Sequence, residues 1–242
     1  YAVMRALKRM KLREGEKFQV TEKELTEAIK RKGPKRKLSE DEEYSTAIHE
    51  GGHAIIACLL EHAPEIDKVT ISSDEDDLYL GAVFFEEKKQ FDITRAEILD
   101  HIAVSLGGRN AEFLFLDDIS AGAQNDLEIA TEAARQMVEE LGMTEVGIRT
   151  TGIHLLGGGK EEMRYGAELR GRMDREIERI LKEQNERVLQ LLKQHGPKIK
   201  KLVDVLLKEK ELKKEKVFEL LELEYPKKKK NKQAKKLLEF EN

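Results

Sequence analysis

Cysteine, proline and aromatic residues are scarce in this sequence, and each scarcity excludes a class of protein. The one cysteine, Cys58, excludes an intrachain disulfide and any cysteine-based zinc finger, and it fits a reducing compartment. Because Cys58 lies in an apolar run, we expect it to be a buried, unreactive thiol. Tryptophan is absent, 5% of the residues are aromatic and four are proline, which favours helices over a β-sandwich. We therefore expect a mostly α-helical protein.

Long apolar runs and a surplus of one charge are also missing. The longest apolar run, residues 54–60, has seven residues, whereas a membrane-spanning helix needs about 20. We expect no membrane span and a soluble fragment, and the N-terminal Tyr1 indicates a piece of a longer protein. The net charge of −4 gives no basic surplus for nucleic acid, so we expect no nucleic-acid partner.

Shifts in composition divide the chain into four parts. Residues 1–32 resemble a small helical unit, and residues 33–38 form a basic linker that contains Gly33 and Pro34. The main domain is expected over 39–225. Residues 226–242 form a lysine-rich tail, for which we expect a solvated end without fixed structure.

Within the main domain, the pattern predicts helices and one small sheet. Ser39 and Glu42 form a capping box before a helix that extends to about residue 60. Short β-branched and aromatic runs between 68 and 85 predict a sheet of two or three strands. The further expected elements are a helix capped by Asp92 or Thr94 that ends at Gly107-Gly108, a helix over 125–141 closed by Gly142, a loop over 144–159, a helical stretch over 161–207 broken at Gly196-Pro197, and a helix over 215–223.

An HExxH motif, His49-Glu50-Gly51-Gly52-His53, lies inside the first of these helices. Positions four apart share a helix face, so both imidazoles can reach one zinc ion. Glu50 suits a general base beside a metal-activated water. A random chain of this composition would contain about 0.03 such motifs. The alternative is that both histidines are exposed or locally hydrogen-bonded residues of an amphipathic helix and bind no metal.

Two features of the motif need partners elsewhere in the chain. Adjacent glycines weaken a helix, so we expect that Gly51-Gly52 lets another backbone, or a substrate, approach closely. A catalytic zinc usually has three protein ligands, and no histidine follows at the position that would extend the motif. The spacing leaves two acids open as the third ligand, Glu112 and Asp126.

Several ordered motifs resemble the peptidase domain of the FtsH family of membrane-anchored, ATP-dependent zinc metalloproteases. They are HEGGHA (49–54), DKVTI (67–71), LGGRNAE (106–112), GAQNDLEIATEAARQMV (122–138) and GM (142–143). The resemblance covers residues 39–225, and residues 1–32 resemble the end of the AAA lid. It implies a helical zinc metallopeptidase domain with a small β-sheet. It also implies Asp126 as third zinc ligand and Glu112 as an acid that supports the ligands.

The resemblance further implies the setting of the full-length protein: a homo-hexamer on the cytoplasmic side of the inner membrane, with an AAA ATPase module, that degrades unfolded or membrane-associated proteins. The sequence GGGK at 157–160 lacks the other residues of a phosphate-binding loop. ATP and Mg²⁺ are therefore expected only on the ATPase part, which this chain lacks.

The sequence thus predicts a zinc endopeptidase in which His49, His53 and Asp126 hold Zn²⁺ and Glu50 is the general base. An extended substrate is expected to pair with an exposed strand, formed by Leu80, Gly81, Ala82, Val83 and Phe84. Two competing readings are a non-catalytic assembly module, in which zinc is structural or absent, and a nucleic-acid binder that uses the lysine tail. The net charge argues against the second.

Overall fold

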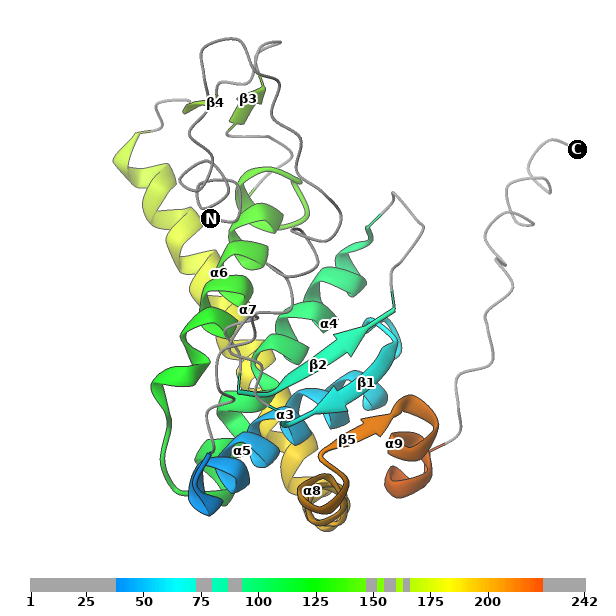
Figure 1. Ribbon diagram of the computed structural model, residues 1–242. Coiled ribbons are helices and arrows are strands. Elements are labelled where there is room, and N and C mark those ends of the chain that lie inside the picture. The colour runs from blue at the N-terminus through cyan, green and yellow to red at the C-terminus, as the bar shows by residue number, and fades with distance from the viewer. Residues whose placement is uncertain are drawn as a thin grey trace, which may run out of the picture. The chain divides into compact units, whose positions relative to one another are not determined.

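Figure 1 shows a computed structural model of the chain, which describes residues 38–72, 80–86, 93–146, 152–154, 160–162 and 166–223. The chain divides into two compact units. The first, residues 1–38 and 73–80, lies almost wholly outside the described residues. So do the expected helical unit over 1–32, nearly all of the basic linker and the lysine-rich tail. The second unit, residues 39–72 and 81–242, contains every element described below.

Helix α3 (Glu40–Leu59) is the central helix of this unit. It begins at the predicted capping box, in which Glu42 N donates to Ser39 Oγ (3.2 Å) and Ser39 N donates to Glu42 Oε2 (2.9 Å). Nearly every residue from Ala47 to Ala57 is buried, because other elements pack around the helix on several sides. From Ala47 onward the motif helix is therefore a core helix, and the polar residues of the motif lie largely in the protein interior.

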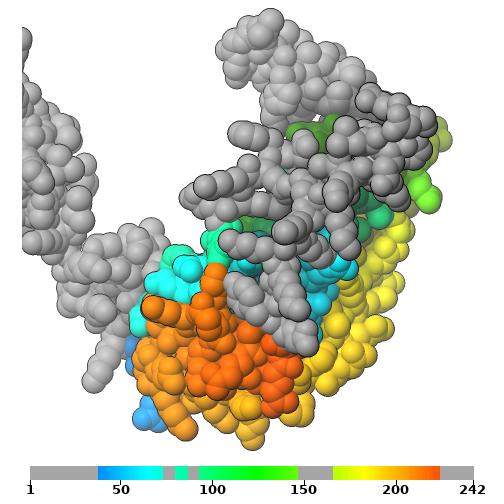
Figure 2. Space-filling view, turned by 90° about the vertical axis from the view of Figure 1, so that its right-hand side faces the viewer, coloured from blue at the N-terminus to red at the C-terminus, as the bar shows by residue number. Residues whose placement is uncertain are grey.

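A three-stranded antiparallel sheet packs on α3, in the order β2 (Ala82–Phe85), β1 (Ile66–Thr70), β5 (Glu211–Lys213). The first two strands are in the predicted region. The third was not predicted, because it has three residues and pairs with β1 about 140 residues earlier in the chain: Val69 lies opposite Val83 on one side and Leu212 on the other. In Figure 2 the C-terminal segment, in orange, lies directly beside the cyan strands.

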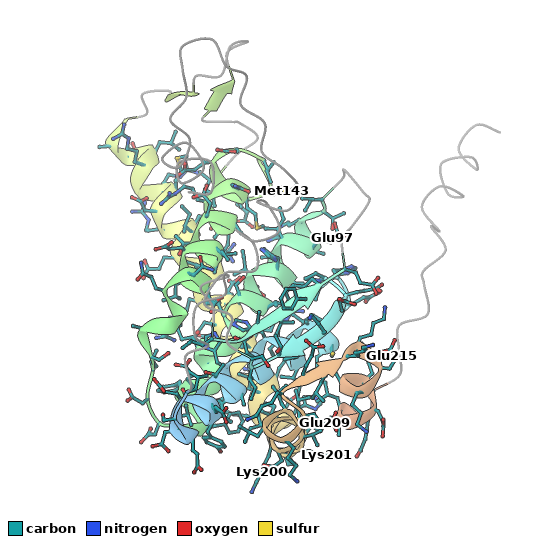
Figure 3. All side chains as sticks on the ribbon, in the orientation of Figure 1. Glu97, Met143, Lys200, Lys201, Glu209 and Glu215 are labelled. Atoms are coloured by element: carbon teal, nitrogen blue, oxygen red, sulfur yellow. The ribbon has the colours of Figure 1, made fainter. Side chains whose placement is uncertain are left out.

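Helix α4 (Arg95–Ser105) is capped by Thr94, whose hydroxyl accepts the N–H of Glu97. Arg95 Nε donates to the carbonyl of Met143, so Met143 lies beside the start of α4, near Glu97 (Figure 3). A second helix, α5 (Gly107–Phe115), follows after one residue. The sequence predicted the end of α4 but not α5, because two adjacent glycines are a typical stop signal. Here they are instead the first turn of a helix.

The remaining helices pack on α3, on α4 or on one another. Helix α6 (Gln124–Glu139) follows a 3₁₀ turn, η1 (Ala121–Ala123), and packs on α4 and on α7 (Ala167–Gln194). Gly142 has a φ of 60° and closes the end of α6, as predicted. Helix α8 (Gly196–Glu209) begins at the predicted Gly196-Pro197 break. It buries its apolar side against α3, while Lys200 and Lys201 point outward (Figure 3). Helix α9 (Lys214–Leu221) ends the described chain.

Two predictions for the stretch between α6 and α7 are wrong. Residues Gly152–His154 form strand β3, inside the expected loop, and pair with Lys160–Glu162, strand β4. The expected long helix therefore begins at Ala167 rather than near 161. Glycine content favours a loop, but it does not exclude a short hairpin, since a hairpin also needs turn residues.

Aliphatic side chains dominate the core, and their packing fixes the position of α3. Ile55 and Ile56 of α3 are fully buried, together with Leu202 of α8 and Val69 of β1. A mostly α fold with a small sheet is thus observed, as expected. Among the described helices, none combines the length and the apolarity that a bilayer crossing requires.

Candidate metal centre

The two motif histidines lie one turn apart on α3 and converge at their outer nitrogens. Their ring centroids are 4.7 Å apart with the planes at 73°, and His49 Nε2 lies 3.0 Å from His53 Nε2. The side chains are only 13% and 10% exposed. The i, i+4 spacing therefore gives the shared face that the sequence predicted.

The first turn of α6 brings Asp126 to the same point. Asp126 Oδ2 lies 3.0 Å from His49 Nε2 and 3.3 Å from His53 Nε2. The η1 turn sets the start of α6, and Ser120 caps it by accepting the N–H of Gly122. Among the described residues, His49, His53 and Asp126 are the one group of histidine, cysteine or acidic residues whose ligand atoms cluster as a metal site requires.

The inner nitrogen of each ring faces an oxygen that accepts a hydrogen bond. His53 Nδ1 donates to the carbonyl of Val104 (2.7 Å), which the end of α4 exposes, and His49 Nδ1 donates to Glu112 Oε1 (2.6 Å). Carbonyl and carboxylate oxygens only accept, so both protons of the neutral rings lie on Nδ1. Both Nε2 atoms then present lone pairs to each other and to Asp126.

This donor set fits a zinc ion. Three lone-pair donors 3.0–3.3 Å apart repel one another unless a cation lies between them. Zinc bonds of about 2.0–2.1 Å in a tetrahedron place neighbouring donors about 3.3 Å apart. Two imidazoles and one carboxylate leave one tetrahedral position for another molecule, as catalytic zinc sites do.

Glu112, the other open candidate for third ligand, lies on the far side of His49. It accepts the His49 Nδ1 proton and is also held by the backbone N–H (2.7 Å) and hydroxyl (3.1 Å) of Ser120. Its side chain is 3% exposed. The carboxylate therefore faces away from the point where the Nε2 atoms meet, and it connects α5, α3 and the turn before α6.

The electrostatics favour positive charge at the centre. Burial by itself lowers the pKa of His49, but the carboxylates of Asp126 and Glu112 outweigh it and raise the pKa to about 10. Burial opposes ionisation of Asp126, but when the rings also carry a proton on Nε2, their hydrogen bonds to its carboxylate hold its pKa well below the usual range. In Glu112, burial is likewise outweighed by His49 and Ser120, which lower the pKa. Two ionised carboxylates therefore flank the ring of His49.

Glu50 is buried beside the centre, with 7% of its surface exposed. Burial raises its pKa, and the histidines oppose this shift. A Cβ built on Gly81, just before β2, would come within 2.8 Å of Glu50 Cγ and 2.6 Å of Thr46 Cγ2. The backbone at Gly81 therefore packs directly on the glutamate. This brings the start of the predicted substrate strand beside the predicted base.

The close backbone approach expected at Gly51-Gly52 is observed at Gly52. A Cβ there would lie 2.4 Å from the carbonyl oxygen of Gly107 and 2.6 Å from Ala111 Cβ, so α5 crosses α3 at a glycine-to-glycine contact. Gly108, next to that contact, faces the two histidine rings. Sequence reasoning missed Gly108. The available signal was its position four residues before Glu112, on the same face of one helix.

Comparison with known proteins gives the same family for most of the chain. The model of peptidase family M41 matches residues 36–220. The chain is 39% identical over 205 residues to ATP-dependent zinc metalloprotease FtsH 1 of Thermoanaerobacter sp. (strain X514), covering 80% of this chain and 33% of that protein. It is 37% identical over 225 residues to ATP-dependent zinc metalloprotease FtsH of Thermus thermophilus, covering 88% and 36%. The chain thus spans about a third of the length of these relatives.

Proposed function

Because the chain belongs to peptidase family M41, we propose that it is the zinc-dependent endopeptidase domain of an ATP-dependent protease. The observation that carries the proposal is the convergence of two imidazole lone pairs and one carboxylate within 3.3 Å, with both Nδ1 protons fixed by acceptors. In this proposal His49, His53 and Asp126 hold Zn²⁺. When bound there, zinc supplies Lewis-acid chemistry: it polarises the scissile carbonyl and makes water more acidic.

Glu50 is the general base in the proposed hydrolysis. It follows His49 directly on α3, is buried, and has a raised pKa, so it can accept a proton from the attacking water and deliver it to the departing amine. Glu50 is not among the three residues that cluster as metal ligands, so its carboxylate is available for proton transfer.

Glu112 is proposed to support the ligand set rather than to join it. Its carboxylate fixes the tautomer and orientation of His49, and an outer carboxylate of this kind raises the basicity of a histidine ligand. Because Glu112 also binds Ser120, it fixes the turn that precedes Asp126 relative to His49. One side chain thus helps to position two of the three ligands.

We propose that an extended substrate pairs with the segment Leu80–Phe84. Among the described strands, β2 is at an edge of the sheet, and Gly81 packs on Glu50 at its start. Neighbouring residues of a strand direct their backbone groups to opposite edges. Ala82→Pro and Val83→Pro each remove one backbone N–H, and only one of these two groups points away from β1, toward the free edge of the sheet. The variant that loses this N–H should raise KM for an extended peptide without lowering the melting midpoint. Unchanged peptide cleavage in both variants would exclude the strand.

The setting of the full-length protein is also a proposal. The names of the relatives support an attached ATPase, so residues 1–32 would be the end of an AAA lid, and ATP and Mg²⁺ would bind outside this chain. We further propose a homo-hexamer on the cytoplasmic side of the inner membrane that degrades unfolded or membrane-associated proteins. Crosslinking of the longer protein, followed by sizing, tests the hexamer.

The test of the catalytic proposal is zinc-dependent casein hydrolysis by the 242-residue chain. A chelator should abolish cleavage and zinc should restore it. Glu50→Gln should lower cleavage by about 10²–10⁴-fold while zinc stays bound, and Asp126→Asn should lose both zinc and activity. Asp204→Asn, an exposed acid on α8, is the matched control and should change neither.

The same experiment separates the protease from a non-catalytic assembly module. A module with structural zinc would bind the metal but would show no cleavage that depends on Glu50. Full zinc binding by Asp126→Asn would remove that residue from the ligand set. Loss of zinc on Glu112→Ala with retention on Asp126→Asn would identify Glu112 as the ligand instead.

A further inference from the structure

We propose that Gly108 is a positioning residue for the metal centre: its missing side chain allows the rings of His49 and His53 to converge. The inference rests on the proposed function, because it concerns zinc. A Cβ built on Gly108 would lie 2.5 Å from His53 Nε2 and 2.6 Å from both Nε2 and Cε1 of His49. Real Cβ atoms essentially never approach other heavy atoms closer than 3.0 Å. No side chain fits at 108 while the rings stay in place.

The two rings have no easy route away from such a Cβ. His49 is held through Nδ1 by Glu112 at 2.6 Å, and His53 is held through Nδ1 by the Val104 carbonyl at 2.7 Å. A rotation that moves either Nε2 away from position 108 moves the opposite nitrogen of the same ring as well. The ring would then lose the hydrogen bond that fixes its tautomer, and the lone pair would leave the meeting point with Asp126.

Helix α5 cannot retreat without disturbing the same site. Gly108 and Glu112 are four residues apart on α5, so they share the face that covers the rings. The preceding residue, Gly107, is in close contact with Gly52 of α3, and Glu112 is bound to Ser120. A shift of α5 large enough to admit a methyl group would pull Glu112 away from His49 and weaken the Ser120 contacts. Every relaxation therefore costs part of the ligand geometry.

The atoms that a methyl group would meet predict which property changes. At Gly108 all three nearest atoms belong to imidazole tips, which can move without unfolding the chain. The fold should therefore survive Gly108→Ala, whereas the ligand set should not. Gly51 offers a matched control on α3. A Cβ there meets methyl groups of Val203 (3.2 Å) and Leu202 (3.9 Å), on a side of the helix away from the rings.

The experiment measures zinc affinity by competition with a chromophoric chelator, and the melting midpoint in excess chelator, for the 242-residue chain. Gly108→Ala should bind zinc at least about 10- to 100-fold more weakly, the effect typical of losing a residue that orients a ligand. Its midpoint without zinc should stay within about 2 °C of the unchanged protein, a shift below roughly 1 kcal/mol. Gly51→Ala should keep the unchanged zinc affinity.

Equal zinc affinity of Gly108→Ala and the unchanged protein would overturn the inference. If Gly108→Ala lowers the midpoint or fails to fold, the same substitution in the His49→Ala/His53→Ala background decides the cause. In this background both imidazole rings are absent. If Gly108→Ala leaves the melting midpoint of the double variant unchanged, the inference is supported. If Gly108→Ala lowers that midpoint as much as it lowers the midpoint of the unchanged protein, the inference is overturned. If the unchanged protein itself binds no zinc, the proposed function is refuted. That result differs from equal zinc binding by both proteins, which refutes only the role of Gly108.

Discussion

Two neighbouring glycines of the motif helix should respond in opposite directions to the same substitution. Ala in place of Gly removes a helix penalty of about 1 kcal/mol at either position. At Gly52 the added methyl group would lie 2.4 Å from the Gly107 carbonyl oxygen and 2.9 Å from its carbon. These are backbone atoms, so the helices must separate. At Gly51 the nearest atom, Val203 Cγ2 at 3.2 Å, belongs to a side chain that needs to move only slightly.

Overpacking of a core costs about 1–3 kcal/mol, and the clash at Gly52 with backbone atoms places Gly52→Ala in the upper part of that range. After the gain of about 1 kcal/mol in helix propensity, the net loss should be about 1–2 kcal/mol. For a domain of this size, roughly 2–4 °C per kcal/mol gives a fall in melting midpoint of about 2–8 °C. Gly51→Ala should leave the midpoint unchanged or raise it by up to about 4 °C. Circular dichroism melts in excess chelator measure both, because bound zinc would otherwise add its own stabilisation. Equal midpoints for Gly52→Ala and the unchanged protein would refute the close contact between α3 and α5.

Three further predictions concern other parts of the chain. Glu112→Gln should weaken zinc binding by about 10- to 100-fold, because it removes the charge that orients His49; chelator competition measures this, and an unchanged affinity would contradict the supporting role. Burial raises the pKa of Cys58 to about 12, so the native thiol stays protonated at pH 8 and should react with a disulfide reagent on the order of 10²-fold more slowly than in denaturant, after allowance for the higher intrinsic nucleophilicity of a more basic thiolate; similar rates would show an accessible thiolate. Gly171→Ala should stabilise α7 by about 1 kcal/mol, because the nearest atom to the added carbon is Arg175 Nη1 at 3.4 Å, the end of a flexible side chain; a lowered melting midpoint would contradict this.

Local signals in the sequence determined the elements that carry the site. The capping box of α3 joins residues three apart, and the HExxH spacing places two imidazoles on one helix face. Such signals depend only on neighbours in the chain, so composition and periodicity are enough to predict them. They fail where length is short or a stop signal is ambiguous: β5 and β3 have three residues each, and Gly107-Gly108 both ends one helix and begins another.

Residue spacing did not decide how the centre is completed: the family resemblance implied Asp126, and the tertiary structure shows the contacts that each acid makes. Spacing left Glu112 and Asp126 open, and only the fold directs Asp126 to the outer nitrogens and Glu112 to the inner nitrogen of His49. The three contacts that fix the rings span 77, 63 and 51 residues, and Gly108 gains its role only because α5 crosses α3 at that point. The sequence by itself determined the motif helix and its two histidines. Distances between elements far apart in the chain follow from core packing, which no local pattern encodes.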